Sequence, residues 1–269
     1  MIEPILNDED RRIWAQWERA SCAHSRTRLH AARVDSAKRY IDEMMIVAPC
    51  AYAAFSGGKD STAMLYLLND NGCSVRVMSV KDDLDFPGEE QFVRSTCERI
   101  GFNLDVLHPP FSLQDWLRHH AYELSADEDM HSRHAEFSKA AFYDVIEAYR
   151  ELHDSPGVFL GLRKQESYGR LMNRVTHGAV YETKIGEWRC QPICDWHGID
   201  VFAFLLSRDA PILDVYRCCR LHESPERIRK SWWLPGKSSR KNGMVWLKTY
   251  YPSLFRRLCS VLPDASASA

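Results

Sequence analysis

Short apolar runs and longer amphipathic stretches alternate along the central part of the chain. Residues 51–55 form a short apolar run, and apolar positions at helical spacing follow between residues 63 and 68. The segment between them, residues 56–61, reads Ser-Gly-Gly-Lys-Asp-Ser and is polar and rich in glycine. The pattern therefore predicts a strand, a tight loop and a helix.

The same alternation continues downstream. Further strands are predicted at residues 73–80, 104–107 and 158–160, and a helix is predicted at residues 89–100. Residues 8–46 and 112–150 have the spacing of helices. Strands that alternate with helices predict an α/β fold, with a doubly wound and mostly parallel sheet and helices on both faces. In such sheets the ligand crevice lies beyond the carboxyl ends of the strands, where residues 56–61 are expected.

The loop at residues 56–61 has the composition of an anion site. Gly57 and Gly58 allow positive φ angles and a close approach of backbone N–H groups to a ligand. The start of the following helix favours an anion, Lys59 adds a positive charge, and Ser56 and Ser61 add hydroxyl donors. The P-loop pattern of nucleoside triphosphatases is not met, because the two glycines are adjacent and Lys59 is followed by an aspartate.

A second polar cluster follows the strand predicted at residues 158–160. Gly161, Arg163, Glu166, Ser167 and Arg170 lie at spacings that a turn or a helix start brings together. Two guanidinium groups suit bidentate binding of phosphate or sulfate, and the carboxylate of Glu166 can orient one of them. An exposed, charged helix start is the alternative.

Composition narrows the class of protein. The chain has 269 residues, of which 45% are hydrophobic, and contains no apolar run of membrane-spanning length. Its first ten residues are acidic, unlike a signal peptide, so we expect a cytoplasmic protein with no membrane partner. Residues 217–257 carry eleven basic and two acidic side chains, whereas the whole chain has a net charge of −2. This basic segment suggests a polyanionic substrate or partner.

Three separated motifs and one shorter match, Phe86-Pro87, resemble one family. The loop at residues 56–61 resembles the PP-loop of the adenine nucleotide α-hydrolase superfamily. Phe86-Pro87, the segment 161–170 and the run Pro-Ile-x-x-Trp-x-x-x-Asp-Val at residues 192–201 are similar to the phosphoadenosine phosphosulfate (PAPS) reductase branch. At residues 81–83 the chain has Lys-Asp-Asp where that branch has Asp-Thr-Gly.

The resemblance implies that the chain binds PAPS or ATP, with Mg²⁺ in the case of ATP and Asp60 as a ligand of that ion. The catalytic residues that it implies are Lys59, Asp60, Arg163 and Arg170. The nucleotide-binding residues that it implies are Ser56, Gly57, Gly58, Lys59, Asp60, Ser61, Asp82, Asp83, Gly161, Arg163, Glu166, Ser167, Arg170 and Trp196. The expected organisation is a helical lead-in at residues 1–46, a nucleotide-binding α/β domain at 47–216 and a basic, aromatic-rich extension at 217–269.

The nine cysteines are an odd number in a chain too long to need disulfide bonds, so reduced thiols or a metal site are the candidates. PAPS reductases carry a nucleophilic cysteine in a C-terminal Glu-Cys-Gly motif, which this chain lacks. Cys259 lies instead in a segment that reads as the end of an amphipathic helix. Cys190, Cys194, Cys218 and Cys219 supply the number of thiolates that an iron–sulfur cluster or a zinc ion takes. Buried, inactive thiols are the alternative.

The basic segment and a pair of histidines each have more than one interpretation. The basic segment interleaves cations with Trp232, Trp233, Trp246, Tyr250 and Tyr251, a composition suited to single-stranded nucleic acid. Alternatively, it is a capping subdomain whose aromatic side chains pack on the sheet. His131 and His134 have the spacing of two metal ligands on a helix, although histidines at a surface explain them as well.

Three functional hypotheses follow. The first is a sulfonucleotide reductase that works with a thioredoxin-like reductant. The second is an ATP pyrophosphatase that activates an acceptor for sulfur transfer, as in the PAPS reductase-like proteins of DNA phosphorothioation systems. The third is a nucleotide-binding module without catalysis. The oligomeric state is left open.

Overall fold

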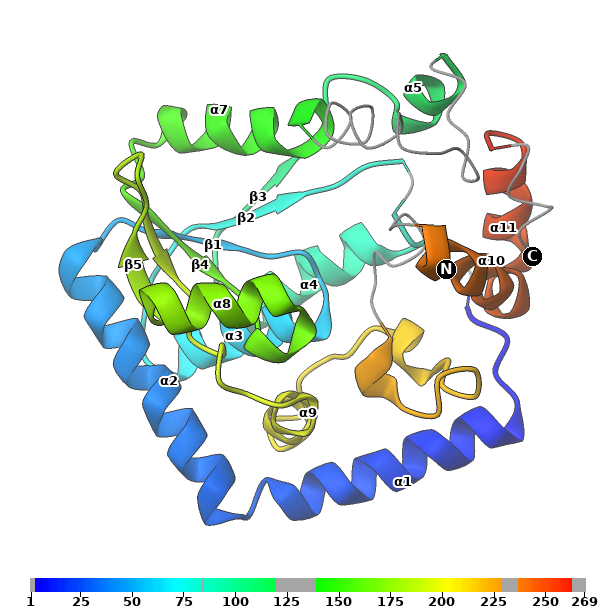
Figure 1. Ribbon diagram of the computed structural model, residues 1–269, viewed down its shortest axis with the longest axis horizontal. Helices are drawn as coiled ribbons and strands as arrows, with labels where there is room; N and C mark the ends of the chain where they lie inside the picture. Colours follow the sequence, from blue (N-terminus) through cyan, green and yellow to red (C-terminus); the bar gives the residue numbers. More distant parts are fainter. Residues whose placement is uncertain (1–2, 84, 120–138, 229–236, 263–269) are drawn as a thin grey trace.

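The computed structural model describes residues 3–83, 85–119, 139–228 and 237–262 (Figure 1). The strands are β1 (Tyr52–Ala54), β2 (Val77–Val80), β3 (Leu104–Leu107), β4 (Gly157–Leu160), β5 (Val180–Glu182) and β6 (Trp188–Cys190). The α-helices are α1 (Asp8–His24), α2 (Arg28–Val47), α3 (Lys59–Asp70), α4 (Glu89–Ile100), α5 (Leu113–His119), α7 (Asp144–Leu152), α8 (Tyr168–His177), α9 (Gly198–Leu206), α10 (Lys237–Tyr250) and α11 (Pro252–Cys259). The shorter helical turns are η1 (Lys139–Tyr143), η2 (Lys164–Glu166), η3 (Asp214–Arg217) and η4 (Pro225–Arg227).

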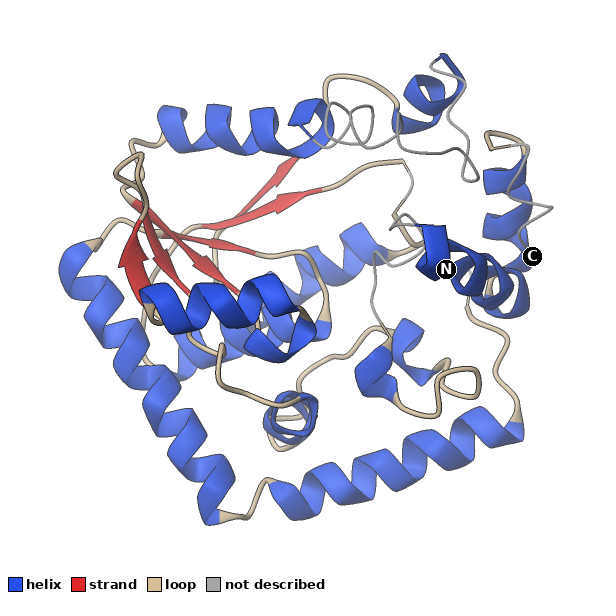
Figure 2. Cartoon of the chain, in the orientation of Figure 1, coloured by secondary structure: helices blue, strands red, loops and turns tan. Residues whose placement is uncertain are grey.

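The sheet has six strands in the order β3-β2-β1-β4-β6-β5 (Figure 2). All neighbouring pairs are parallel except β5 and β6, which are antiparallel. The predicted α/β fold with a mostly parallel sheet is therefore confirmed. The hairpin of β5 and β6 was not predicted, because strands of three residues are too short to show an alternating pattern.

Strand β1 lies where the direction of winding changes. The chain passes from β1 to β2 and β3 on one side, and it returns to β4 on the other side of β1. The carboxyl end of β1 is thus the switch point at which doubly wound sheets bind ligands. Residues 56–61 follow this end directly.

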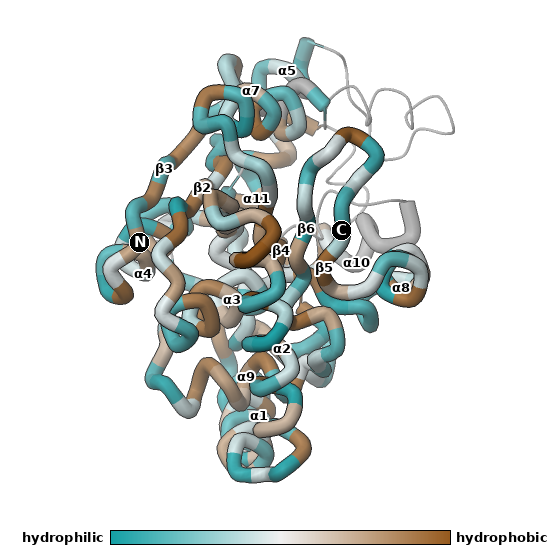
Figure 3. Tube along the Cα trace, turned by 90° about the vertical axis from the view of Figure 1, so that its left-hand side faces the viewer, coloured by the Kyte–Doolittle hydropathy of each residue, from teal (hydrophilic) through white to brown (hydrophobic). Residues whose placement is uncertain are grey.

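One face of the sheet is covered by α3 and α9, which bury nearly all of their side chains. The largest fully buried side chains here include Phe55, Phe159, Trp196 and Phe204. Helix α2 adds Ile41 and Met44 to the same core. Figure 3 shows that α8, in contrast, carries both strongly hydrophilic and hydrophobic positions.

A second core joins the two ends of the described chain. Helix α1 packs against α9 and η3, and α10 and α11 complete the cluster with Trp246, Tyr250 and Phe255 (Figure 1). The buried carboxylate of Asp10 accepts hydrogen bonds from the Tyr250 hydroxyl at 2.7 Å and from the backbone N–H of Arg220 at 2.8 Å. The predicted helical lead-in is present, and it shares this core with the C-terminal extension.

Within the described part of the chain, no helix combines the length and the apolar composition that crossing a membrane requires.

Candidate functional site

The loop after β1 adopts a conformation that only glycine accommodates easily. Gly57 has a φ of +81°, and a Cβ atom there would lie 3.0 Å from Cγ2 of Val93. The Ser56 hydroxyl oxygen accepts a hydrogen bond from the Gly58 N–H at 3.3 Å and lies 3.0 Å from the Ser61 hydroxyl. The predicted tight loop between a strand and a helix is therefore present, and it is fastened by its own serines.

Helix α3 begins at the loop, with Gly58 as its N-cap residue and without a side-chain cap. The N–H of Lys59 donates to the hydroxyl of Tyr216 at 3.0 Å, and the Lys59 ammonium lies 5.2 Å from the centre of the Tyr216 ring. Burial raises the pKa of Tyr216, so the phenol stays protonated. Sequence reasoning did not identify Tyr216 as a site residue, because this contact spans 157 positions.

Lys59, Asp60 and Arg163 form one buried ionic cluster. The Asp60 carboxylate lies 2.8 Å from the Lys59 ammonium through Oδ2 and 2.6 Å from Nε of Arg163 through Oδ1. The side chains of Lys59 and Arg163 are 2% and 3% exposed. Burial alone would raise the pKa of Asp60, but the two cations hold it below its ordinary value. Two predicted motifs thus meet in space through Asp60 and Arg163, which are 103 positions apart in sequence.

Gly161 explains how closely the two motifs approach. Strand β4 pairs with β1, and Gly161 follows β4 directly. A Cβ atom at Gly161 would lie 2.7 Å from both Cα and N of Ser61, in the first turn of α3. Only a residue without a side chain lets the end of β4 deliver Arg163 against this turn.

Glu166 connects the two arginines of the second motif. Its carboxylate pairs with Arg170 and lies 3.8 Å from the guanidinium of Arg163. The Ser167 hydroxyl caps α8 by accepting from the Arg170 N–H at 3.2 Å. Arg163 is also 3.8 Å from the carboxylate of Glu226, a residue that sequence reasoning did not select. The structure therefore brings Arg163, Glu166, Ser167 and Arg170 together at the start of α8.

Helix α8 turns its polar side toward the protein. Arg174 binds the Asp195 carboxylate at 2.8 Å, and Asn173 donates to the Tyr181 hydroxyl at 3.2 Å. The apolar side chains of Tyr168 and Val175, 76% and 70% exposed, lie on the surface. Polar contacts, and not apolar burial, hold this helix beside the site.

The loop after β2 also contacts residues 56–61. The ammonium of Lys81 donates to the Ser56 carbonyl at 3.2 Å, pairs with Glu89 in the first turn of α4, and lies 3.6 Å from Asp85. Lys81 is 2% exposed. It stands where the resembling family has aspartate, and sequence reasoning gave it no role in the site.

The two predicted aspartates of this loop differ. The Asp83 carboxylate accepts from the Ser112 hydroxyl at 2.6 Å, which directs it to the start of α5 and leaves the predicted nucleotide contact without support. The Asp82 N–H donates to Asp85 at 3.2 Å, and a nucleotide contact of the Asp82 side chain stays a prediction.

The predicted role of Trp196 is wrong. Its indole is 1% exposed, packs against Phe204 in the core, and donates its N–H to the Arg33 carbonyl at 3.2 Å. The indole therefore joins α2 to the core, and its burial leaves it inaccessible to a nucleotide.

The predicted cluster of four cysteines is not formed. Cys190 and Cys194 lie in the core around α3, whereas Cys218 and Cys219 lie in the second core. The four thiols are not among the side chains that gather as potential metal ligands within the described residues. Burial raises the pKa of each, to about 12 for Cys194 and Cys219. All nine cysteines are free.

The aromatic side chains of the basic segment mostly serve the core. Trp246, Tyr250 and Tyr251 are 0%, 0% and 4% exposed, so the expectation that they stack on bases is wrong. They are packed in the interior, as the alternative expected, but in the second core and not on the sheet. Trp232 and Trp233, together with His131 and His134, lie outside the described residues.

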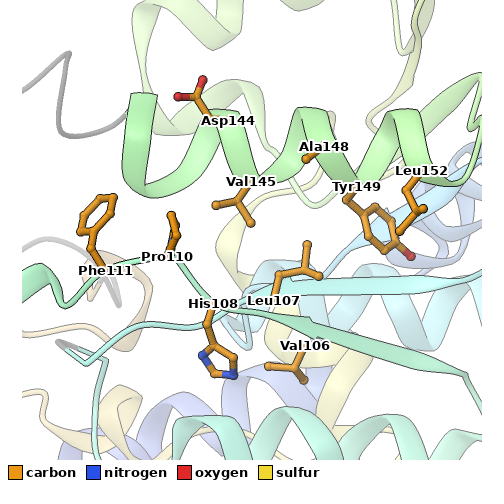
Figure 4. Close-up of a pocket in the computed structure, with 10 residues that line it drawn as sticks. All are labelled: Val106, Leu107, His108, Pro110, Phe111, Asp144, Val145, Ala148, Tyr149 and Leu152. Atoms are coloured by element: carbon orange, nitrogen blue, oxygen red, sulfur yellow. The ribbon is translucent and has the colours of Figure 1, made fainter.

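A cavity of about 590 Å³ lies apart from this cluster, between β3 and α7 (Figure 4). Its walls are largely apolar, with Leu107 facing Val145 and Tyr149 of α7. None of the predicted site residues lines it. The ionic cluster, and not this cavity, is therefore the candidate site.

Comparisons with known proteins show the family of the chain. The family model of the phosphoadenosine phosphosulfate reductase domain matches residues 51–219. The adenosine 5'-phosphosulfate reductase of Neisseria meningitidis serogroup B is 29% identical, over 39% of this chain and 51% of that protein. The phosphoadenosine 5'-phosphosulfate reductase of Xanthomonas euvesicatoria pv. vesicatoria is 26% identical, over 58% of this chain and 61% of that protein. The chain thus spans between half and two thirds of these relatives.

Solved structures share the fold at 14% identity. PAPS reductase from Candida auris has a TM-score of 0.52, over 66% of this chain and 81% of that one. FMN adenylyltransferase from Candida glabrata, in complex with ATP, also has a TM-score of 0.52, over 77% of this chain and 67% of that one. The same architecture therefore occurs in a sulfonucleotide reductase and in an ATP-binding adenylyltransferase.

Proposed function

Because the chain belongs to the phosphoadenosine phosphosulfate reductase family, we propose that it is an enzyme that binds an adenine nucleotide at residues 56–61 and acts at the nucleotide's α-phosphate or sulfate. The observation that carries the proposal is the meeting of Lys59, Asp60 and Arg163 at the carboxyl ends of β1 and β4. This cluster places two buried cations beside the first turn of a helix, an arrangement that attracts a polyanion.

The cluster is suited to stabilising charge. Asp60 holds Lys59 and Arg163 in fixed positions, so little reorganisation is needed when negative charge develops on a bound phosphate or sulfate. Arg170, oriented by Glu166 and 34% exposed, is available to an anion at the edge of the site. Catalysis would rest on positioning and electrostatics, without a protein nucleophile.

The positions of the thiols favour ATP over PAPS. A reductase of this family needs an accessible thiolate, which requires exposure and a lowered pKa. Cys190, Cys194, Cys218 and Cys219 are fully buried with raised pKa values, and burial also raises the pKa of Cys259. With ATP, an acceptor atom would bond to the α-phosphorus while the bond to the bridging oxygen breaks and pyrophosphate leaves with the electron pair.

Sulfonucleotide reduction is the second candidate, and the names of the sequence relatives favour it. It would require a thioredoxin-like reductant and a nucleophilic thiol. Cys22 and Cys50 are exposed, so the thiol would be one of these two or a buried cysteine that becomes exposed during turnover.

Asp60 does not fit the predicted role of a Mg²⁺ ligand. Both of its carboxylate oxygens are engaged by cations, Oδ1 by Arg163 and Oδ2 by Lys59. Mg²⁺ keeps several waters and often binds through the substrate's phosphates, so an ion that accompanies ATP would be held mainly by the nucleotide.

The test is an anaerobic incubation of the purified chain with ATP and Mg²⁺ and, separately, with PAPS and a thioredoxin system. Ion-exchange chromatography resolves the nucleotide products. AMP and pyrophosphate are expected from ATP, and Lys59→Ala should abolish their formation while the circular dichroism spectrum stays unchanged. Full activity of Lys59→Ala would refute the site.

The other outcomes separate the alternatives. Adenosine 3',5'-bisphosphate and sulfite from PAPS would establish the reductase. Micromolar binding of ATP by calorimetry without any product, in the presence of candidate acceptors, would leave a nucleotide-binding module.

A further inference from the structure

Three side chains from distant parts of the chain meet at the corner between α1 and α2. Nε2 of His24 lies 2.7 Å and Nδ1 of His30 lies 3.4 Å from the same carboxylate oxygen, Oδ1 of Asp200. The two imidazole centres are 5.4 Å apart. The separations in sequence are 176 and 170 residues, so only the folded chain creates this group.

Local structure fixes each member of the group. His24 is the last residue of α1, and His30 lies in the first turn of α2, which Thr27 caps. Asp200 is the third residue of α9 and closes the capping box of that helix with the His197 N–H at 2.7 Å. The three residues therefore stand on helix ends whose positions are set by capping and by the packing of α1 on α9.

The group is enclosed but can be reached from solvent. Asp200 is 0% exposed and His30 is 5% exposed, whereas His24 is 16% exposed. Two imidazoles and a carboxylate are a ligand set that zinc takes in proteins, with a solvent molecule in the remaining position. Tetrahedral zinc sites with bonds of about 2.0–2.2 Å leave ligand atoms roughly 3.3 Å apart. The three candidate ligand atoms lie within 4.8 Å of one another, so small side-chain shifts would bring them to that spacing.

The second oxygen of the carboxylate is already supported. Oδ2 of Asp200 pairs with Arg33 and accepts the hydrogen bond from the His197 N–H. Carboxylates that bind a metal through one oxygen are commonly oriented by hydrogen bonds to the other. Oδ1, which both histidines share, is thus the oxygen presented to an ion.

We propose that His24, His30 and Asp200 form a zinc site that fastens the corner between α1 and α2 to the start of α9. Metal binding requires each imidazole to direct a lone pair at the ion, so the ring nitrogens that now face Oδ1 must carry no proton. The protons move to the other ring nitrogens or leave to solvent. The site is separate from the proposed nucleotide site and does not depend on its function.

The experiment uses the full chain after dialysis against a chelator. Calorimetric titration with ZnCl₂ is expected to show one ion per chain, and saturating zinc should raise the unfolding temperature by at least about 3 °C. CoCl₂, used as a spectroscopic probe, should give the visible absorption of a tetrahedral site.

Variants assign the ion to these residues. His24→Gln and His30→Gln should each weaken zinc binding at least about tenfold, and both should abolish the tetrahedral cobalt spectrum. Two control variants should bind zinc like the unaltered chain. His177→Gln removes an exposed histidine on α8, and Cys22→Ser removes an exposed thiol near His24.

Two results would overturn the proposal: no saturable zinc binding by the unaltered chain, or unchanged binding by both histidine variants. If the variants fail to fold, the unaltered chain decides. A cobalt spectrum typical of octahedral coordination, or several equivalent weak sites, would also contradict the proposal.

Discussion

Nε of Arg163 lies 2.6 Å from Oδ1 of Asp60, and both side chains are largely withdrawn from water. Burying either charge without a partner of opposite sign would be costly, so each side chain lowers the cost of burying the other. The pair thereby joins the end of β4 to the first turn of α3, so the same contact is expected to contribute to stability and to the arrangement of the site.

Arg163→Ala should leave Asp60 with Lys59 as its remaining cationic partner among the contacts described above. We expect a loss of about 3 kcal/mol in the free energy of unfolding, measured with urea at pH 7.5. Arg150→Ala is the control, because its ion pair with Glu147 is on the surface and should contribute less than about 1 kcal/mol. Equal losses in the two variants would contradict the importance of the Arg163–Asp60 pair.

Gly161→Ala should disturb the site through sterics alone. The added methyl group meets backbone atoms of Ser61 at 2.7 Å, so α3 or β4 must shift, at a cost of about 1–3 kcal/mol in stability and with weaker nucleotide binding. Gly169→Ala is the matched control, since nothing lies within 4 Å of its added methyl group and alanine favours a helix. Urea unfolding and calorimetry with ATP report both effects. A fully stable Gly161→Ala would show that the two elements separate easily.

Lys81 is expected to position the loop at residues 56–61 through the Ser56 carbonyl. The triple variant Lys81→Met, Asp85→Asn, Glu89→Gln removes the contact together with the two carboxylates that Lys81 pairs with, and it should weaken ATP binding roughly tenfold. Lys184→Met, at an exposed position, controls for the loss of one positive charge. Unchanged ATP affinity in a folded triple variant would assign Lys81 to packing only.

Asp195 should make stability depend on pH in the acid range. Burial alone would raise its pKa, but hydrogen bonds from Arg174 and Lys164 lower it from 3.8 to about 2 in the folded chain. Because the folded pKa is the lower one, the contribution of Asp195 is present above about pH 4 and is lost as the pH falls toward 2. The midpoint of urea unfolding, followed from pH 5 to pH 3, should therefore fall less steeply in Asp195→Asn. Identical slopes would show that Asp195 is not preferentially ionised in the folded state.

Local signals predicted the elements on which the site is built. Residues 104–107 and 89–100 have the predicted bounds, and α4 ends at Gly101, which has a φ of +77° and therefore suits a helix end. The motifs at residues 56–61 and 161–170 were recognised because each has glycine and charged residues directly after a predicted strand. Their meeting follows from the pairing of β1 with β4.

Contacts that depend on tertiary structure escaped prediction. Nothing near Tyr216 in sequence indicates that its hydroxyl reaches the Lys59 N–H, and nothing near Lys81 indicates its partner Ser56. The roles predicted for Trp196 and for the four cysteines at positions 190, 194, 218 and 219 were wrong for a different reason. Their side chains are buried in the core. A motif fixes where the backbone runs, whereas burial decides what its side chains can touch.

The contact between Asp10 and Tyr250 has a consequence for synthesis of the chain. The two residues are 240 positions apart, so at about 5–20 residues per second α1 leaves the ribosome roughly 12–48 s before its partner is made. Before α10 is made, Trp14 and Trp17 can pack against Phe202 of α9, which is translated earlier than α10 and α11. The second core can therefore be completed only after α11 has been translated.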